Sequence, residues 1–180
     1  MAYQFQSLKV LVVDDNRPMI ELAKAILNTF GVGTVYTAMN GDDGFKIFCE
    51  SNPDLVLVDW MMSPGDGIEM SRRIRNDPTS PNQYVPIILM TGFSEKKRVI
   101  HARDSGITEF LVKPFSARTL YKRIAQIVEK PRQFIRAEGF FGPDRRRKTA
   151  DTYNGPLRRK SDRAGGRDAV GSYMVDVKDG

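Results

Sequence analysis

Five short apolar runs dominate the first two-thirds of the chain and constrain its fold more than any other feature. The runs are rich in Val, Ile and Leu, and most of them lack the alternation of apolar and polar residues that marks a half-exposed strand. Continuous hydrophobicity is typical of strands whose sheet is covered by helices on both faces. The predicted strands are residues 8–13, 33–38, 54–59, 85–90 and 108–113.

Segments with helical spacing of apolar residues lie between and after these runs. The first has Asp15 or Asn16 as a candidate cap, Pro18 in its first turn and Gly31 as a stop. Strict alternation of strands and helices with short connections implies right-handed crossovers. We therefore predict an α/β fold with a doubly wound, five-stranded parallel sheet. The other predicted helices span residues 41–50, 66–76, 94–105 and 116–129.

Polar and charged residues stand where four of the five runs end. They are Asp14 and Asp15 after the first run, Asp59 in the third, Thr91 after the fourth and Lys113 in the fifth. Because the carboxyl ends of parallel strands meet at one edge of a sheet, we expect these side chains to converge. Three carboxylates, a hydroxyl and an ammonium group would then share a single site.

Such a site favours a divalent cation and a phosphate group. Clustered carboxylates repel one another unless a cation lies among them. Mg²⁺ prefers oxygen ligands and keeps several waters, which leaves space for a phosphate oxygen. One carboxylate can then attack phosphorus, while Lys113 and Thr91 bind phosphoryl oxygens.

Each of these residues also has a simpler interpretation when it is taken alone. Asp15 could only cap the first helix, and Lys113 could be an ordinary solvated lysine. Thr91 could simply begin a loop. Trp60 is expected to pack over the loop that follows Asp59, although its ring could also restrict water near that residue.

Four motifs together resemble the receiver domain of bacterial two-component response regulators. They are Asp14-Asp15, Asp59, the sequence Met-Thr-Gly at 90–92 and the sequence Phe-Leu-Val-Lys-Pro-Phe at 110–115. The resemblance covers residues 7–128, so we expect a receiver domain over residues 1–130. It implies the flavodoxin-like strand order 2-1-3-4-5.

The resemblance also implies roles for individual residues. Asp59 would accept a phosphoryl group from a histidine kinase or a histidine phosphotransferase. Asp14, Asp15, Asp59 and the backbone carbonyl of Met61 would hold Mg²⁺. Only self-phosphorylation and self-dephosphorylation chemistry, and no further enzymatic activity, is expected.

The same resemblance implies a conformational switch. Thr91 would move toward the aspartyl phosphate and Phe110 would turn inward. The face made by the fourth helix, fifth strand and fifth helix would then change its affinity for a downstream protein. The Lys113-Pro114 bond is expected to be cis. The chain departs from the family where Ser63 and Pro64 stand, since many members have proline four residues after the phosphoacceptor.

The chain has a single cysteine, Cys49, and no apolar run near the roughly 18 residues that a membrane helix needs. The first eight residues lack the features of a secretory signal. We therefore expect a cytoplasmic protein without a membrane span.

Positive charge is concentrated after residue 130. Of the 28 Lys and Arg residues 12 lie in residues 131–180, against 7 of the 22 acidic ones, which gives this part five of the six net charges. Few apolar residues accompany them, so we expect a flexible, largely disordered tail without an independent core. Residues 170–177 form one candidate strand within it.

The tail contains a repeated Gly-Pro-x-Arg-Arg-basic motif, at 142–147 and 155–160. It is either a solvated linker or a pair of docking motifs for an acidic protein, and nucleic-acid binding is a further alternative. A metal-dependent phosphohydrolase is the alternative for the whole chain. The arginines expected to carry tail binding are Arg145, Arg146, Arg147, Arg158 and Arg159.

Overall fold

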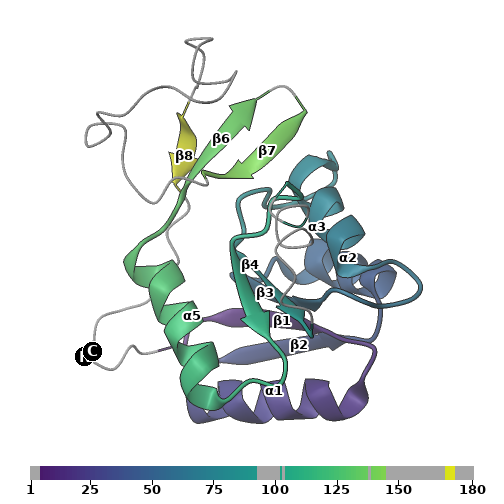
Figure 1. Cartoon of the computed structure of the whole chain (residues 1–180), viewed down its shortest axis with the longest axis vertical. Helices are drawn as coiled ribbons and strands as arrows, with labels where there is room; N and C mark the ends of the chain where they lie inside the picture. The colour runs from purple at the N-terminus through teal and green to yellow at the C-terminus, as the bar shows by residue number, and fades with distance from the viewer. Residues whose placement is uncertain (1–4, 93–101, 103, 138, 145–168, 173–180) are drawn as a thin grey trace.

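A computed structural model describes residues 5–92, 102, 104–137, 139–144 and 169–172 of the 180-residue chain. Its main feature is a parallel sheet in the order β2-β1-β3-β4-β5, which confirms the expected topology (Figure 1). β3 and β4 are buried along their whole length. The strands are β1 (Lys9–Val13), β2 (Thr34–Ala38), β3 (Leu55–Asp59), β4 (Ile87–Thr91) and β5 (Glu109–Val112).

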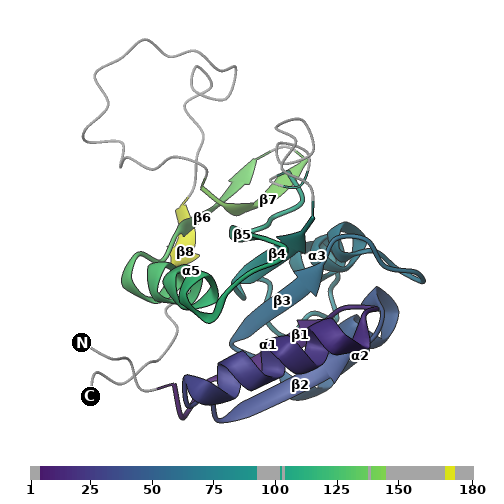
Figure 2. The ribbon, with the colours of Figure 1, turned by 60° about the horizontal axis from the view of Figure 1, so that its bottom comes forward.

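Helices cover both faces of this sheet, as the continuous apolar runs predicted. Alternate residues of β1 pack into different cores: Val10 and Val12 into the one with α1 and α5, Leu11 and Val13 into the other with α2 and α3. In Figure 2, α1 crosses in front of β1 and β2. The helices are α1 (Arg17–Thr29), α2 (Gly41–Ser51), α3 (Gly67–Asn76) and α5 (Ala117–Glu129).

Side-chain caps fix where these helices begin. Asn16, Asn40, Asp66 and Ser116 each accept a hydrogen bond from a backbone N–H of the first turn. Asn16, and not Asp15, is therefore the cap of α1, so the carboxylate of Asp15 is not used in that cap. The helix predicted over residues 94–105 lies mostly outside the described residues.

A second, antiparallel sheet follows α5 and differs from the expected flexible tail. It contains β6 (Gln133–Ala137), β7 (Phe140–Pro143) and β8 (Ala169–Ser172) in the order β7-β6-β8. The expectation of a flexible tail after residue 130 is wrong for β6 and β7. Its physical reason is that Phe134 and Phe141 pack against Tyr84 of the receiver fold, so the segment needs no core of its own.

β8 overlaps the start of the strand predicted over residues 170–177, of which residues 173–177 lie outside the described part. Residues 77–84 lie in the connection from α3 to β4, at the end of the sheet opposite the carboxyl ends of its strands. The last of these residues, Tyr84, contacts β6 and β7. The segment after α5 is thus part of the fold and lies at the amino ends of β4 and β5 (Figure 1).

Candidate functional site

The structure brings the predicted side chains to one edge of the parallel sheet. Asp59 is the last residue of β3 and Thr91 the last residue of β4, while Asp14 follows β1 and Lys113 follows β5. The register holds neighbouring strands level, because Asp59 pairs with Met90 and Thr91 pairs with Val112. Strand ends alone therefore position the site.

Three carboxylates form the acidic part of the site. One oxygen atom each from Asp14, Asp15 and Asp59 lies within 4.8 Å of the other two. Asp14 is fully buried and Asp59 is 7% exposed, whereas Asp15 is open to solvent. The cluster therefore has two fixed members and one at its rim.

Lys113 joins the two buried carboxylates. Its Nζ donates to Oδ2 of Asp14 at 2.6 Å and lies 2.7 Å from Oδ1 of Asp59. This contact excludes the interpretation of Lys113 as an ordinary solvated lysine. The Lys113-Pro114 bond is cis, as expected.

Burial and the neighbouring charges shift the pKa values of this pair. Burial raises the pKa of Asp59, the hydrogen bond and charge of Lys113 oppose the rise, and Asp14 and Asp15 add to it. Burial alone would lower the pKa of Lys113, but its bonds to Asp14 and Asp59 outweigh burial and raise that pKa. Lys113 is therefore held as a cation between the carboxylates.

Backbone contacts hold the acidic residues in place. Oδ1 of Asp14 accepts a hydrogen bond from the N–H of Asn16 at 2.9 Å. The N–H of Gly67 donates to the carbonyl of Trp60 at 3.1 Å. A Cβ at Gly67 would lie 2.1 Å from the carbonyl oxygen of Asp59, so only glycine allows α3 to start this close to the strand.

The loop after Asp59 contacts the start of α2. The N–H of Gly41 donates to the carbonyls of Pro64 and Gly65, at 3.2 and 3.0 Å. Gly65 has a φ of +70°, and the Ser63-Pro64 bond is cis. The departure from the family pattern at these positions is thus accommodated by a loop that is bonded to α2.

The remaining predicted residues lie around this centre. Thr91 is buried, and its carbonyl accepts a bond from the N–H of Lys113 at 2.8 Å. Phe110 and Trp60 are half-buried and pack against the core that faces α2 and α3, which supports the packing interpretation of Trp60. The side chain of Met61 is exposed.

The five tail arginines, Arg145, Arg146, Arg147, Arg158 and Arg159, lie outside the described residues. Their predicted role therefore stays a prediction.

The donor set fits Mg²⁺. Three carboxylates converge, their oxygens are hard ligands, and the exposed member leaves the site open to solvent on one side. Soft ligands are missing from this cluster, which contains aspartates only. A hard divalent cation is therefore the ion that the residues suit.

A family model for the response regulator receiver domain matches residues 10–125, which include all of these side chains. The chain belongs to the response regulator receiver family. Members of this family are two-component proteins that act in phosphorelays. The receiver match ends before β6, so the second sheet lies outside the family pattern.

Known relatives agree with this assignment. The phosphate regulon transcriptional regulatory protein PhoB of Pseudomonas aeruginosa is 31% identical over 121 residues, which are 67% of this chain and 52% of PhoB. The chain thus spans about half the length of that relative. The chemotaxis protein CheY-3 of Vibrio cholerae is 28% identical over 125 residues, 69% of this chain and 95% of CheY-3.

Solved structures show the same fold. The chemotaxis response regulator CheY4 of Vibrio cholerae has a TM-score of 0.62 and 26% identity, and the match covers 67% of this chain and 98% of that one. Among the described residues, none of the helices has the length and apolar character that crossing a membrane requires.

Sequence reasoning missed two buried charged residues that lie away from this site. Arg75 is 1% exposed, and Glu109 is 7% exposed. Glu109 carried a weak signal, because it interrupts the apolar run 108–113. Arg75 directly follows Ile74 on the buried side of α3, and nothing local distinguishes it from a solvated arginine.

Proposed function

We propose that Asp59 is the phosphoacceptor of this receiver domain and that its donor is a histidine kinase or a histidine phosphotransferase. The observation that carries the proposal is the position of Lys113, whose ammonium group lies between Asp14 and Asp59 at the edge where four strands end. A phosphoryl group attached to Asp59 would meet this cation directly.

The transfer replaces one bond to phosphorus by another. An Oδ atom of Asp59 attacks the phosphorus of the phosphohistidine, and the P–N bond breaks. The electron pair of that bond leaves with the donor's imidazole, which takes up a proton. Lys113 then pairs with a phosphoryl oxygen, and the Thr91 hydroxyl hydrogen-bonds another.

Asp14, Asp15, Asp59 and the backbone carbonyl of Met61 would hold Mg²⁺. The ion would supply positive charge that screens the approach of an anionic phosphoryl group to a carboxylate. The buried Asp14 is held in place on one side of this site, because its Oδ1 accepts the N–H of Asn16 and its Oδ2 accepts a hydrogen bond from Lys113.

The signal to a downstream protein would pass through β5, the strand that carries Phe110. Phe110, which lies on β5 between Glu109 and Lys113, would turn inward after phosphorylation. A downstream protein would bind the face made by the segment 94–105, β5 and α5. The protein would act as a phosphoacceptor in the cytoplasm, with self-phosphorylation from small donors and self-dephosphorylation as its only chemistry.

The basic residues after 144 supply a second binding element. Their charge suits an acidic protein or the phosphates of a nucleic acid. The family match does not favour a nucleic-acid-associated regulator or a metal-dependent phosphohydrolase as the main function of the chain.

Phosphorylation of the full chain with acetyl phosphate and Mg²⁺ tests the proposal. The wild type is expected to gain one phosphoryl group in its intact mass, and chelation of Mg²⁺ should prevent the gain. Asp59→Asn should not be labelled, whereas the control Asp54→Asn, at the residue before the same strand, should be. Equal labelling of the Asp59→Asn variant would refute the assignment.

A further inference from the structure

β6 and β7, with the turn between them, form an antiparallel unit, here called the C-terminal hairpin (residues 133–143). Phe134 and Phe141 of this hairpin are 3% and 6% exposed. Their rings and that of Tyr84 form a triad with centroids 5.2, 5.4 and 5.7 Å apart. The hairpin is therefore packed against the receiver domain at the segment that leads into β4.

Arg75 of α3 takes part in the same contact between the hairpin and the receiver domain. Its Nε and Nη2 donate to the carbonyl of Gly106 at 3.0 and 2.9 Å, and its Nη1 donates to the carbonyl of Gln83 at 2.8 Å. The guanidinium lies 5.0 Å from the centre of the Phe134 ring. Burial lowers the pKa of this group, and the three bonds to carbonyl oxygens favour its charged form.

The backbones of the hairpin and the receiver domain also meet. A Cβ at Gly142 of β7 would lie 2.9 Å from the Cα of Gly106. Gly106 itself has a φ of +82°, and a Cβ there would lie 2.7 Å from Cγ of Arg75. Two glycines thus allow β7, the segment before β5 and Arg75 to stack without space between them.

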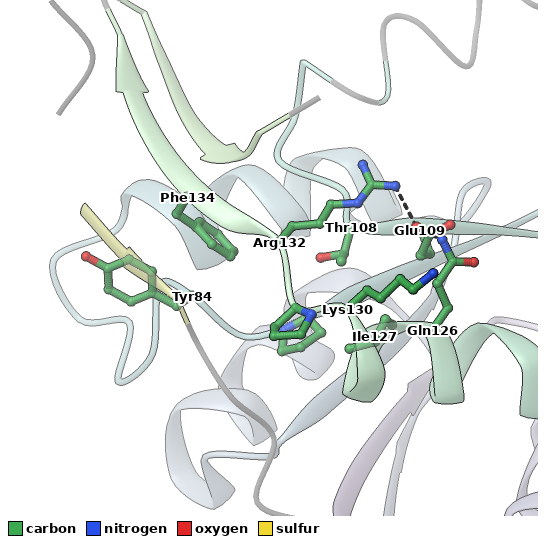
Figure 3. A pocket seen from close by; sticks show the side chains of 10 residues that line it. Tyr84, Thr108, Glu109, Gln126, Ile127, Lys130, Arg132 and Phe134 are labelled. Atoms are coloured by element: carbon green, nitrogen blue, oxygen red, sulfur yellow. Dashed lines mark hydrogen bonds and ion pairs between the residues drawn. The ribbon is translucent and has the colours of Figure 1, made fainter. Parts of the chain in front are cut away.

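Glu109, the first residue of β5, forms an ion pair with the residue that leads into the hairpin. Nη2 of Arg132, the residue before β6, donates to Oε1 of Glu109 at 2.6 Å (Figure 3). Gln126 of α5 donates to the same oxygen at 3.3 Å, and Arg123 lies 3.5 Å from the other. Because Glu109 is buried, this ion pair is shielded from solvent more than a surface pair is.

Two short elements connect these contacts to the phosphoacceptor site. β5 runs from Glu109 to Val112 and is followed by Lys113, over about 13 Å for four residues. α3 starts at Gly67, which touches the Asp59 carbonyl, and Arg75 lies about 12 Å farther along the helix, eight residues later. At the other end, Glu109 of β5 is bonded to Arg132, the residue before the hairpin, and Arg75 of α3 lies against Phe134 of the hairpin.

We propose that docking of the C-terminal hairpin is coupled to phosphorylation of Asp59, so that phosphorylation weakens docking and docking disfavours phosphorylation. The inference rests on the proposed function of Asp59. Nζ of Lys113 lies between Asp14 and Asp59, so pairing with a phosphoryl oxygen on Asp59 moves it from its present position, and in the proposed coupling the end of β5 shifts with it. Arg132, which leads into the hairpin, is bonded to Glu109 of β5 in the present position, and the coupling acts equally in both directions.

Hydrogen exchange of the full chain tests the proposal without any variant. Amides of residues 133–137 and 140–142 are followed with and without acetyl phosphate and Mg²⁺, and the intact mass of each sample records its phosphorylation. Phosphorylation is expected to speed exchange in the hairpin by about fivefold, the low end of usual coupling. Unchanged or slower exchange in a phosphorylated sample would overturn the coupling and leave the proposed function intact. A sample that takes up no phosphoryl group would overturn both.

Arg132→Gln tests the reverse direction. Loss of the bond to Glu109 should raise the steady-state phosphorylated fraction with acetyl phosphate relative to the wild type. Arg118→Gln removes the same charge from an exposed position on α5 and should leave that fraction unchanged. If Arg132→Gln and Arg118→Gln gave the same phosphorylated fraction, the coupling would be excluded.

Discussion

The two ends of the parallel sheet use charged residues in opposite ways. At the carboxyl edge, Lys113 binds both Asp14 and Asp59, and the cluster stays accessible through Asp15. At the amino edge, Arg75 is bonded to backbone carbonyls and covered by an aromatic ring. Charge at one end of the sheet is thus available for a ligand, while charge at the other end holds two parts of the chain together.

The largest effect on stability is expected for Arg75→Ala. This change leaves the buried carbonyls of Gly106 and Gln83 without their donor and removes the group under Phe134. The free energy of unfolding should fall by about 3 kcal/mol. Urea denaturation at equilibrium measures it, and the exposed Arg72→Ala on the same helix should cost below about 0.5 kcal/mol. If both variants lost the same free energy of unfolding, Arg75 would not hold the two parts of the chain together.

Lys113→Met tests the carboxyl edge. The methionine keeps the length of the side chain but removes the cation that meets the phosphoryl group. The rate of phosphorylation by acetyl phosphate is expected to fall on the order of 100-fold, as for loss of one preorganised donor. Intact-mass kinetics would show it. A rate within twofold of the wild type would mean that the ammonium serves the fold alone.

Gly142→Ala tests the backbone contact between β7 and Gly106. The added Cβ would meet the Cα of Gly106 at 2.9 Å, so β7 must shift away from it. A loss of about 1–2 kcal/mol in the free energy of unfolding is expected from overpacking. Gly92→Ala is the matched control, since a Cβ there has no atom within 4 Å. The free energy of unfolding of this control, measured in urea, should stay near that of the wild type.

The smallest effect is expected for Arg132→Gln, which removes the ion pair with Glu109. Arg132 is partly exposed, so the pair should contribute about 1 kcal/mol or less to stability. The difference between wild type and variant should shrink in high salt. Denaturation at two salt concentrations measures it, and a salt-independent loss of several kcal/mol would contradict a partly screened pair.

The sheet and helices were predictable because their signals are local. Apolar runs and helical spacing placed the described elements to within about two residues of their observed ends. The site was predictable because Asp59 and Lys113 each stand at the end of a strand, and a parallel sheet brings such ends together. The strand order itself came from the family resemblance.

The C-terminal hairpin was not predictable in the same way. Phe134 and Phe141 stand in a segment that is otherwise polar and basic, and their partner Tyr84 lies in a distant turn. Arg75 is buried only because Gly106 and Gln83 supply carbonyl oxygens to it. Contacts between residues so far apart in sequence leave no periodic pattern, so composition alone indicated a solvated tail.

The short connection between α5 and β6 has a practical consequence. Only residues 130–132 separate the end of the helix from the first hairpin strand. An undocked hairpin would therefore stay within a few residues' reach of its binding surface, at a high effective concentration, and modest contacts suffice to hold it there. A fragment cut at residue 130 would leave Tyr84 and Arg75 uncovered, so phosphorylation measured on such a fragment would describe a different molecule.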